Sequence, residues 1–236
     1  MNGFIEKMAF KYRDNAIAKF LVRPFYRMKV KQEEKTRRKL YHKNAYELLM
    51  QLKHTLDSNK IFFWLEFGTL LGAYREKDFI KHDLDLDIGL FFDNPKLVRD
   101  AFENGGFKLK KEFRVGNDGN LGFEETYFYK GVTVDVFYFH KSEDVMYCNT
   151  FSPFKDEYTD MSTFQVKQIT VPFTGFSKLT FKNMEFNVPA DIATHLKCHY
   201  GNDFMIPNAN FDYRKEATNI HWYKREERVA KYKSYM

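Results

Sequence analysis

The spacing of hydrophobic and polar positions changes along the chain, from a helical period near residue 40 to strand-like runs after residue 60. Apolar side chains recur every three or four positions between residues 41 and 57, which predicts a helix ending around Asp57 to Asn59. Its apolar stripe consists of Tyr41, Ala45, Leu48, Leu49, Leu52 and Leu56. A buried strand over 61–67 then runs into the turn Gly68-Thr69, and a short helix over 70–75 follows.

Strands and two further helices are predicted for the rest of the chain. The predicted strands cover 85–92, 107–115, 121–129, 132–139, 145–149, 166–173 and 179–186. Pro95 opens a helix that Gly105-Gly106 closes, and Pro189 opens another that ends at Tyr200-Gly201. The pair Lys130-Gly131 suits a tight hairpin. This mixture of elements predicts an α+β (α/β-like) fold.

The first 40 residues predict a basic helical arm. Apolar residues recur at helical spacing between Phe4 and Val22, with lysines among the remaining positions. Pro24 is expected to stop or kink this helix near Arg23. A basic amphipathic segment of this kind can lie on an anionic membrane surface, or it can pack on its own domain or on a partner subunit.

Charge divides the chain into three regions. Residues 1–40 hold 12 Lys and Arg against 4 acidic residues, a net charge of +8, and residues 214–236 hold 7 against 3, a net charge of +4. Because the whole chain carries +6, residues 41–213 carry −6. We therefore divide it into a basic arm over 1–40, a central domain over 41–213 and a basic C-terminal tail over 214–236. An acidic central body argues against a nucleic-acid groove, so no nucleic-acid partner is expected.

Composition limits the compartment. Hydrophobic residues make up 44% of the 236 positions and aromatics 18%, which excludes a largely disordered chain. Cys148 and Cys198 fit no metal-binding spacing and are too few for a disulfide framework, which indicates a reducing compartment. No run of about 18 apolar residues and no secretory signal occur. We expect a cytoplasmic protein. Its basic arm would allow it to attach peripherally to the inner face of the membrane.

Three aspartates stand at alternate positions: Asp83, Asp85 and Asp87. On a strand their carboxylates project from one face. Two such charges about 4 Å apart repel by about 4 kcal/mol at an effective dielectric constant of ~20, so a positive group is expected beside them. An all-oxygen site suits Mg²⁺ or Mn²⁺. The alternative is an exposed acidic turn that binds nothing.

A fourth aspartate, Asp135, lies in the β-branched and aromatic run 132–140. It is a candidate for a further metal ligand brought from a neighbouring strand, because phosphoryl-transfer sites take carboxylates from more than one element. The alternative is a strand-edge residue whose carboxylate accepts hydrogen bonds from backbone amides.

The stretch 64–90 resembles the LicD and fukutin family, a branch of the nucleotidyltransferase superfamily. The residues that carry the resemblance are Gly68, Thr69, Leu70, Leu71, Gly72, Arg75, Ile80, Asp83, Asp85 and Asp87. The run VDVFYF with Asp135 is similar to a later strand of the family, and Val188-Pro189, Leu196, Tyr200-Gly201 and Pro207 are similar to its closing pattern. One departure is Lys81-His82, where the family usually has Pro-Trp.

The resemblance implies a nucleotidyltransferase-fold mixed sheet flanked by helices and a magnesium-dependent transferase. Such an enzyme moves a phosphorylated small group from a CDP-linked donor to a hydroxyl of a cell-surface glycan or glycolipid precursor. Phosphocholine is the best-known group in bacterial relatives, and the human fukutin pair moves ribitol phosphate. Phosphoethanolamine, aminoethylphosphonate and other polyol phosphates fit the same chemistry. A true nucleotidyltransferase is the alternative.

Within that scheme Asp85, Asp87 and Asp135 would hold one or two Mg²⁺ ions. Asp83 would be an outer ligand, an acceptor-side base or a group that orients its neighbours. Gly68 and Thr69 would bind a phosphate through the turn. Thr69 could equally be a helix N-cap.

Four other side chains near these motifs leave alternatives open. Arg75 could contact the phosphate or form a structural ion pair with an aspartate. Glu66 could be a base, a cation partner or a solvated strand end. His82 and His140 could assist proton transfer. For a quaternary amine cargo, the available aromatic faces are Trp64, Tyr74, Tyr127, Tyr129 and Trp222.

Overall fold

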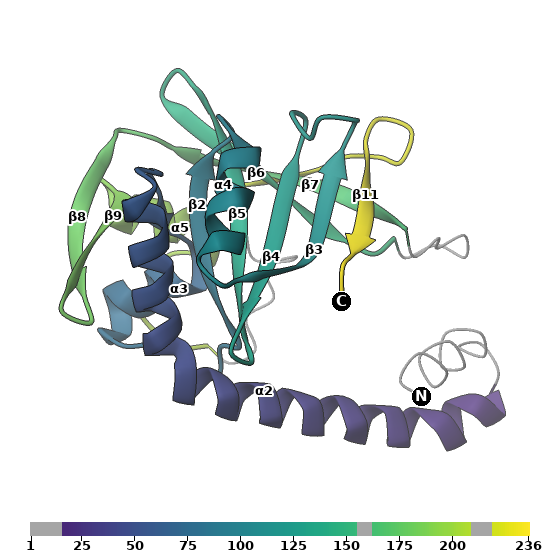
Figure 1. Cartoon of the computed structure of the whole chain (residues 1–236). Coiled ribbons are helices and arrows are strands. Elements are labelled where there is room, and N and C mark those ends of the chain that lie inside the picture. The colour runs from purple at the N-terminus through teal and green to yellow at the C-terminus, as the bar shows by residue number, and fades with distance from the viewer. Residues whose placement is uncertain (1–15, 155–161, 209–218) are drawn as a thin grey trace.

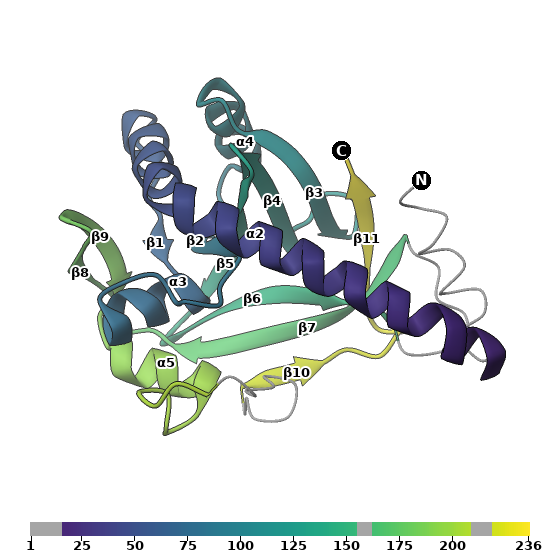
Figure 2. The same cartoon turned by 90° about the horizontal axis from the view of Figure 1, so that it is seen from below.

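The computed structural model describes residues 16–154, 162–208 and 219–236 (Figure 1). Most of the predicted arm helix between Phe4 and Val22 falls on residues 1–15 and therefore lies outside the described residues. Helices flank one face and the ends of a large mixed sheet (Figures 1 and 2). The predicted α+β class, a mixed sheet flanked by helices, is confirmed.

The described strands form one sheet in the order β10-β7-β11-β3-β4-β5-β2-β1-β9-β8, and β6 joins β5 to β7. Their bounds are β1 Trp64–Leu65, β2 Asp85–Phe91, β3 Lys108–Val115, β4 Phe123–Tyr129, β5 Val132–Ser142, β6 Val145–Ser152, β7 Thr163–Pro172, β8 Phe176–Phe181, β9 Met184–Pro189, β10 Ile220–Trp222 and β11 Val229–Ser234. The helical elements are α2 Ala16–Ser58, α3 Phe67–Leu71, the π-helix η1 Gly72–Glu76, α4 Pro95–Asn104 and α5 Ile192–Tyr200.

The centre of the sheet is a parallel pair, β2 and β5. Its register sets Asp87 opposite Asp135 and Asp85 opposite Thr133. The chain reaches β5 through the antiparallel β4–β5 hairpin, whose turn residues Lys130 and Gly131 have φ of 45° and 91°. The predicted Lys130-Gly131 hairpin is confirmed.

Part of the sheet closes on itself. Antiparallel pairing runs from β5 to β6, β7, β11, β3 and β4 and back to β5. β11 completes this ring between β3 and β7, and β10 pairs with β7. Both strands come from residues 214–236, the segment expected as a basic tail, so part of that segment belongs to the sheet.

Helix α2 joins the sheet to a projecting segment. The six residues of its predicted apolar stripe are all buried, and the helix ends at Ser58, as predicted. Its N-terminal part extends away from the sheet (Figures 1 and 2). Pro24 was expected to stop or kink a helix near Arg23, and the stop is wrong, because α2 runs through Pro24. Proline removes one backbone hydrogen bond, a cost of about 3 kcal/mol that packing elsewhere along a long helix can offset.

Other predicted bounds shift. The strand predicted over 61–67 shortens to β1, because α3 already begins at Phe67. The strand predicted over 179–186 is a hairpin of β8 and β9, which turns at Lys182 and Asn183 with positive φ at both. Pro189 ends β9, and α5 begins at Ile192 behind the N-cap Asp191.

No helix among the described residues has an apolar stretch long enough to cross a bilayer.

Candidate active site

The sheet register gathers the predicted aspartates. Asp85 and Asp87 project from the same face of β2, and Asp135 projects from the adjoining position of β5. Asp83 lies in the loop that enters β2. A Cβ atom built on Gly68 would be 3.0 Å from Asp83 Oδ2 and 3.1 Å from Asp87 Oδ2. The Asp83 and Asp87 carboxylates therefore pack against a backbone position that tolerates only glycine without displacement.

The Gly68-Thr69 turn fixes Asp87. The amide of Gly68 donates to Asp87 Oδ2 at 3.0 Å, and the amide of Asp87 donates to Thr69 Oγ1 at 2.8 Å. Thr69 is therefore not the N-cap of α3, a position that Glu66 takes by accepting from the Phe67 amide. The turn therefore positions the Asp87 carboxylate. A phosphate bound at the Gly68 amide, as the sequence predicted, would have to displace Asp87 from this hydrogen bond.

Asp135 belongs to an interior strand. β5 lies between β2 and β4, and Thr126 Oγ1 of β4 donates to Asp135 Oδ1 at 2.5 Å. The alternative of a strand-edge aspartate bonded only to backbone amides is therefore wrong. Thr126 leaves part of the carboxylate available to another ligand.

The aspartates perturb one another. Burial, then the neighbouring Asp135 carboxylate, raises the pKa of Asp85 to about 7. Burial and Asp85 raise the pKa of Asp87 well above its ordinary value, and burial raises the pKa of Asp83 to about 6 although Arg75 opposes the change. These half-buried oxygen donors lack sufficient positive charge, which is the setting that a hard dication fits.

Three cations lie beside the acidic face. Arg37 of α2 places an Nη atom 3.6 Å from Asp85 Oδ2. A β-bulge between Leu109 and Lys111 shifts the register of β3 against β4, and the two consecutive lysines Lys110 and Lys111 lie there. Burial, then the proximity of Arg37 and Lys111, lowers the pKa of Lys110, so the three cations form one cluster.

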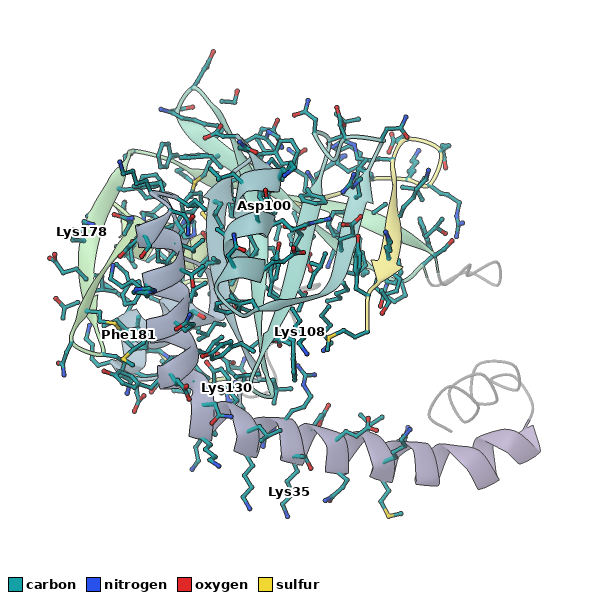
Figure 3. The ribbon with its side chains drawn as sticks, viewed as in Figure 1. Lys35, Asp100, Lys108, Lys130, Lys178 and Phe181 are labelled. Carbon is teal, nitrogen blue, oxygen red and sulfur yellow. The ribbon has the colours of Figure 1, made fainter. Side chains whose placement is uncertain are left out.

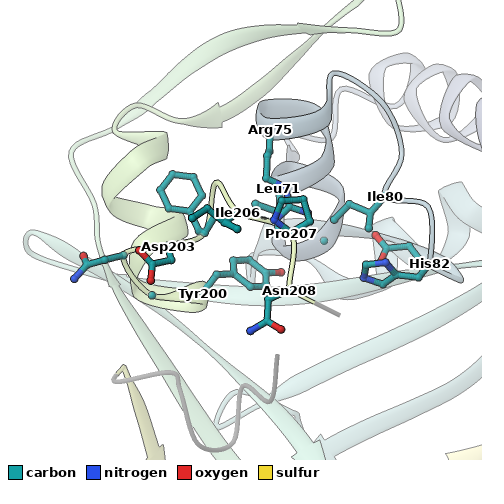
Figure 4. Close-up of a pocket in the computed structure, with 14 residues that line it drawn as sticks. Leu71, Arg75, Ile80, His82, Tyr200, Asp203, Ile206, Pro207 and Asn208 are labelled. Carbon is teal, nitrogen blue, oxygen red and sulfur yellow. Dashed lines mark hydrogen bonds between the residues drawn. The ribbon is translucent and has the colours of Figure 1, made fainter. Parts of the chain in front are cut away.

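A pocket of about 880 Å³ opens on the other side of Asp83 (Figure 4). Tyr200 and Asp203 come from the end of α5 and the following loop, while Arg75 and His82 come from the opposite wall. Arg75 is held by Glu76 through Nε at 2.8 Å and by the Phe204 carbonyl through Nη1 at 2.8 Å. Its ion pair is thus with a glutamate, not with an aspartate as the structural alternative supposed.

A second cluster, of Glu66, His195 and His199, escaped the sequence analysis. Its possible ligand atoms all lie within 4.8 Å of one another. Among the described residues, no other group of three His, Cys, Asp or Glu side chains comes this close together. The aspartate carboxylates are spread more widely, and a cation between them would have to draw them together by side-chain rotation. The signal was available, because histidines four positions apart on a predicted helix share a face.

Glu66 is fully buried, so the alternative of a solvated strand end is wrong. Burial by itself would raise the pKa of Glu66, but the charge and hydrogen bonds of His195 and His199 outweigh it and hold the pKa well below the ordinary value. His140 lies elsewhere, with its ring packed against Phe92 and Tyr147.

Comparison with known proteins identifies the family. Residues 60–191 match the family described as LicD/FKTN/FKRP, nucleotidyltransferase domain, which is more than half of the chain. The chain belongs to this family. The match includes the Gly68-Thr69 turn and all four aspartates, and it confirms the resemblance found in the sequence.

Several named proteins are similar to parts of the chain. Human ribitol-5-phosphate transferase FKTN is 28% identical over 182 residues, which are 76% of this chain and 37% of that protein. Human ribitol 5-phosphate transferase FKRP is 27% identical over 129 residues, 51% of this chain and 25% of that protein. An uncharacterized protein of Caenorhabditis elegans is 39% identical over 101 residues, 40% of this chain and 25% of its own length. The chain thus spans little more than a third of FKTN.

We predict that Thr69→Val destabilises the fold, because the buried amide of Asp87 loses its acceptor while the side-chain shape is kept. The free energy of unfolding in urea should fall by about 1–3 kcal/mol. Thr69→Ser keeps the hydroxyl and serves as the matched control. Equal losses in both variants would show that the methyl group, and not the hydrogen bond, matters.

Proposed function

We propose that this protein is a divalent-metal-dependent transferase that moves a phosphorylated small group from a CDP-linked donor to a hydroxyl of a glycan or glycolipid precursor. The observation that carries the proposal is the register that sets Asp87 opposite Asp135, with Asp85 on the same face. Membership of the LicD/FKTN/FKRP family supports the same chemistry. Mg²⁺ is the preferred ion, and Mn²⁺ the alternative, because all the donor atoms are carboxylate oxygens.

Asp85, Asp87 and Asp135 would hold the ion, which when bound would neutralise charge on the diphosphate. Gly68 and Thr69 keep Asp87 in place through the two hydrogen bonds of the turn. Asp83 lies between this face and the pocket, so it is placed to orient an acceptor hydroxyl or to take its proton. Its raised pKa suits a group that gains and loses a proton near neutral pH.

One dication cannot neutralise both the three aspartates and the two negative charges of a diphosphate diester. Further positive charge comes from the cation cluster beside Asp85, which consists of Arg37, Lys110 and Lys111. These side chains would bind the diphosphate oxygens through charge-assisted hydrogen bonds. Lys111 also faces Glu124, whose Oε1 is 4.0 Å from its Nζ. Arg37 and Lys110 are therefore the stronger candidates for donor binding.

Ribitol phosphate or another polyol phosphate is the transferred group that we favour. The similar human proteins are named as ribitol-5-phosphate transferases. The pocket beside Asp83 offers polar side chains suited to hydroxyl groups, among them Asn202, Asp203 and Asn208. Tyr200 and Phe204 in the same pocket favour phosphocholine as a second candidate, because aromatic faces attract a quaternary amine.

We predict that donor binding depends on the aspartates and on the ion. Isothermal titration calorimetry with CDP-ribitol should show binding in the presence of Mg²⁺, and EDTA should abolish it. CDP-choline is titrated separately as the alternative donor. Asp87→Asn and Asp135→Asn should each weaken binding at least about tenfold, because each removes a charge that attracts the ion. Asp100→Asn on the exposed surface of α4 is the control (Figure 3). Full metal-dependent binding by either site variant would remove that residue from the proposal.

We predict that Arg37→Ala and Lys110→Ala each weaken binding of CDP-ribitol about tenfold while binding of cytidine changes little, because each removes a charged hydrogen-bond donor to phosphate. Lys35→Ala, two positions from Arg37 and exposed on the projecting part of α2, is the matched control (Figure 3). If the donor and cytidine weaken together, the cluster acts on the fold and not on the phosphates.

We also propose that the basic arm attaches the protein to anionic membrane surfaces. The projecting part of α2 is exposed over residues 31–39, and the net charge of residues 1–40 is +8. The full chain should co-sediment with vesicles that contain phosphatidylserine and less with phosphatidylcholine vesicles. A chain lacking residues 1–30 should lose the difference, and equal partitioning of both chains would contradict the proposal.

A further inference from the structure

The cluster of Glu66, His195 and His199 converges on one point inside the protein. His195 Nε2 lies 2.7 Å from Glu66 Oε1, His199 Nε2 lies 3.4 Å from the same oxygen, and the two Nε2 atoms are 3.2 Å apart. All three side chains are at most 5% exposed. We propose that this cluster is a second metal site, distinct from the aspartates, which binds Zn²⁺.

The separations suit zinc. Around a tetrahedral Zn²⁺ with Zn–N and Zn–O distances of about 2.0–2.1 Å, neighbouring ligand atoms lie about 3.3 Å apart. Two of the three observed separations already match this value, and the third would widen by about 0.6 Å. Two imidazoles and one carboxylate are a common zinc donor set, whereas Mg²⁺ prefers oxygen donors. With three protein ligands, zinc needs one further ligand, which a water molecule would supply, whereas iron would need more open coordination positions than this buried place offers.

Surrounding groups orient the ligands. The Trp64 indole donates to Glu66 Oε2 at 2.7 Å, which leaves Oε1 directed at the histidines. Trp64 is itself fixed, because its ring packs so closely on Gly89 that a Cβ atom at this position would overlap the ring. Metal-binding side chains are usually held by such outer hydrogen bonds.

Asn219 would complete the support of His199. Its side-chain nitrogen lies 3.5 Å from His199 Nδ1, and its buried oxygen has no partner among the described residues. Rotation of this amide by 180° about its terminal bond lets the oxygen accept from Nδ1–H of His199. The Nε2 lone pair of His199 is then free to bind the metal.

The site would join the two walls of the proposed active site. Glu66 precedes the Gly68-Thr69 turn that holds Asp87, and α5 with His195 and His199 leads into Tyr200 of the pocket. Between them, Phe67 has a φ of 40°, a strained conformation for a bulky residue, and its ring packs on Phe137 and His199. A metal there would stabilise this strained junction. This supporting role rests on the proposed function, whereas zinc binding itself does not.

The experiment treats the full chain with a chelator, adds zinc sulfate alone, removes the excess and measures bound metal and melting temperature. We expect about one equivalent of zinc and a rise in Tm of about 5 °C or more. Magnesium chloride should not displace the zinc. Co²⁺ in its place should give the intense visible absorption of a four-coordinate site with imidazole ligands.

His199→Gln and Glu66→Gln should lose the bound zinc and the rise in Tm, while His54→Ala, an exposed histidine of α2, should keep both. Retention of less than about a tenth of an equivalent by the unmodified chain would overturn the proposal and leave a hydrogen-bonded His–Glu–His cluster. Equal zinc in His199→Gln would also overturn it. If the variants do not fold, the Co²⁺ spectrum of the unmodified chain decides. Magnesium-dependent binding of CDP-ribitol is a separate measurement and can fail or succeed independently.

Discussion

The structure depends on one constraint, the partial burial of several like charges on a single sheet face. Parallel pairing of β2 with β5 puts Asp87 beside Asp135, and Asp85 lies two positions away on the same face. Burial of carboxylates that repel one another opposes folding unless hydrogen bonds and positive charge compensate. The Gly68 amide, the Thr126 hydroxyl and the Arg37 guanidinium supply part of this compensation. The α3 turn, the β3 bulge and the position of α2 all contribute to it.

The opposite face of the sheet holds a buried carboxylate whose oxygens all have hydrogen-bond partners. Glu125 of β4 is fully buried, but it accepts hydrogen bonds from the Tyr127 and Tyr138 hydroxyls and pairs with Arg99 of α4. Every oxygen of Glu125 has a partner, and this network holds α4 on the sheet. Burial raises the pKa of Glu125 as it raises those of Asp85 and Asp87, but the two aspartates have fewer partners. The contrast separates a structural acid from acids suited to bind a ligand.

Local features of the sequence predicted the elements around the site. The alternation of Asp85 and Asp87 predicted that one strand presents these acids on one face, and the Lys130-Gly131 turn predicted that the Asp135 strand lies beside its predecessor. Asp83 fell outside that strand, in the loop before it. Pairing between distant segments could not be inferred in this way. β11 pairs with residues of β3 more than 100 positions away and with residues of β7 more than 60 positions away, and nothing in the local pattern specifies such partners.

The parts of the site that escaped prediction share a physical reason. Arg37 reaches Asp85 from a helix that ends before the motif begins, and His195 meets Glu66 across 129 positions. Each contact depends on packing, which composition and periodicity do not encode. Phe67 shows why the two clusters nevertheless belong together. Its positive φ lets Glu66 point to the histidines while the next amide, of Gly68, points to Asp87. One strained residue therefore sets the geometry of both clusters, so a change at either is expected to be felt at the other.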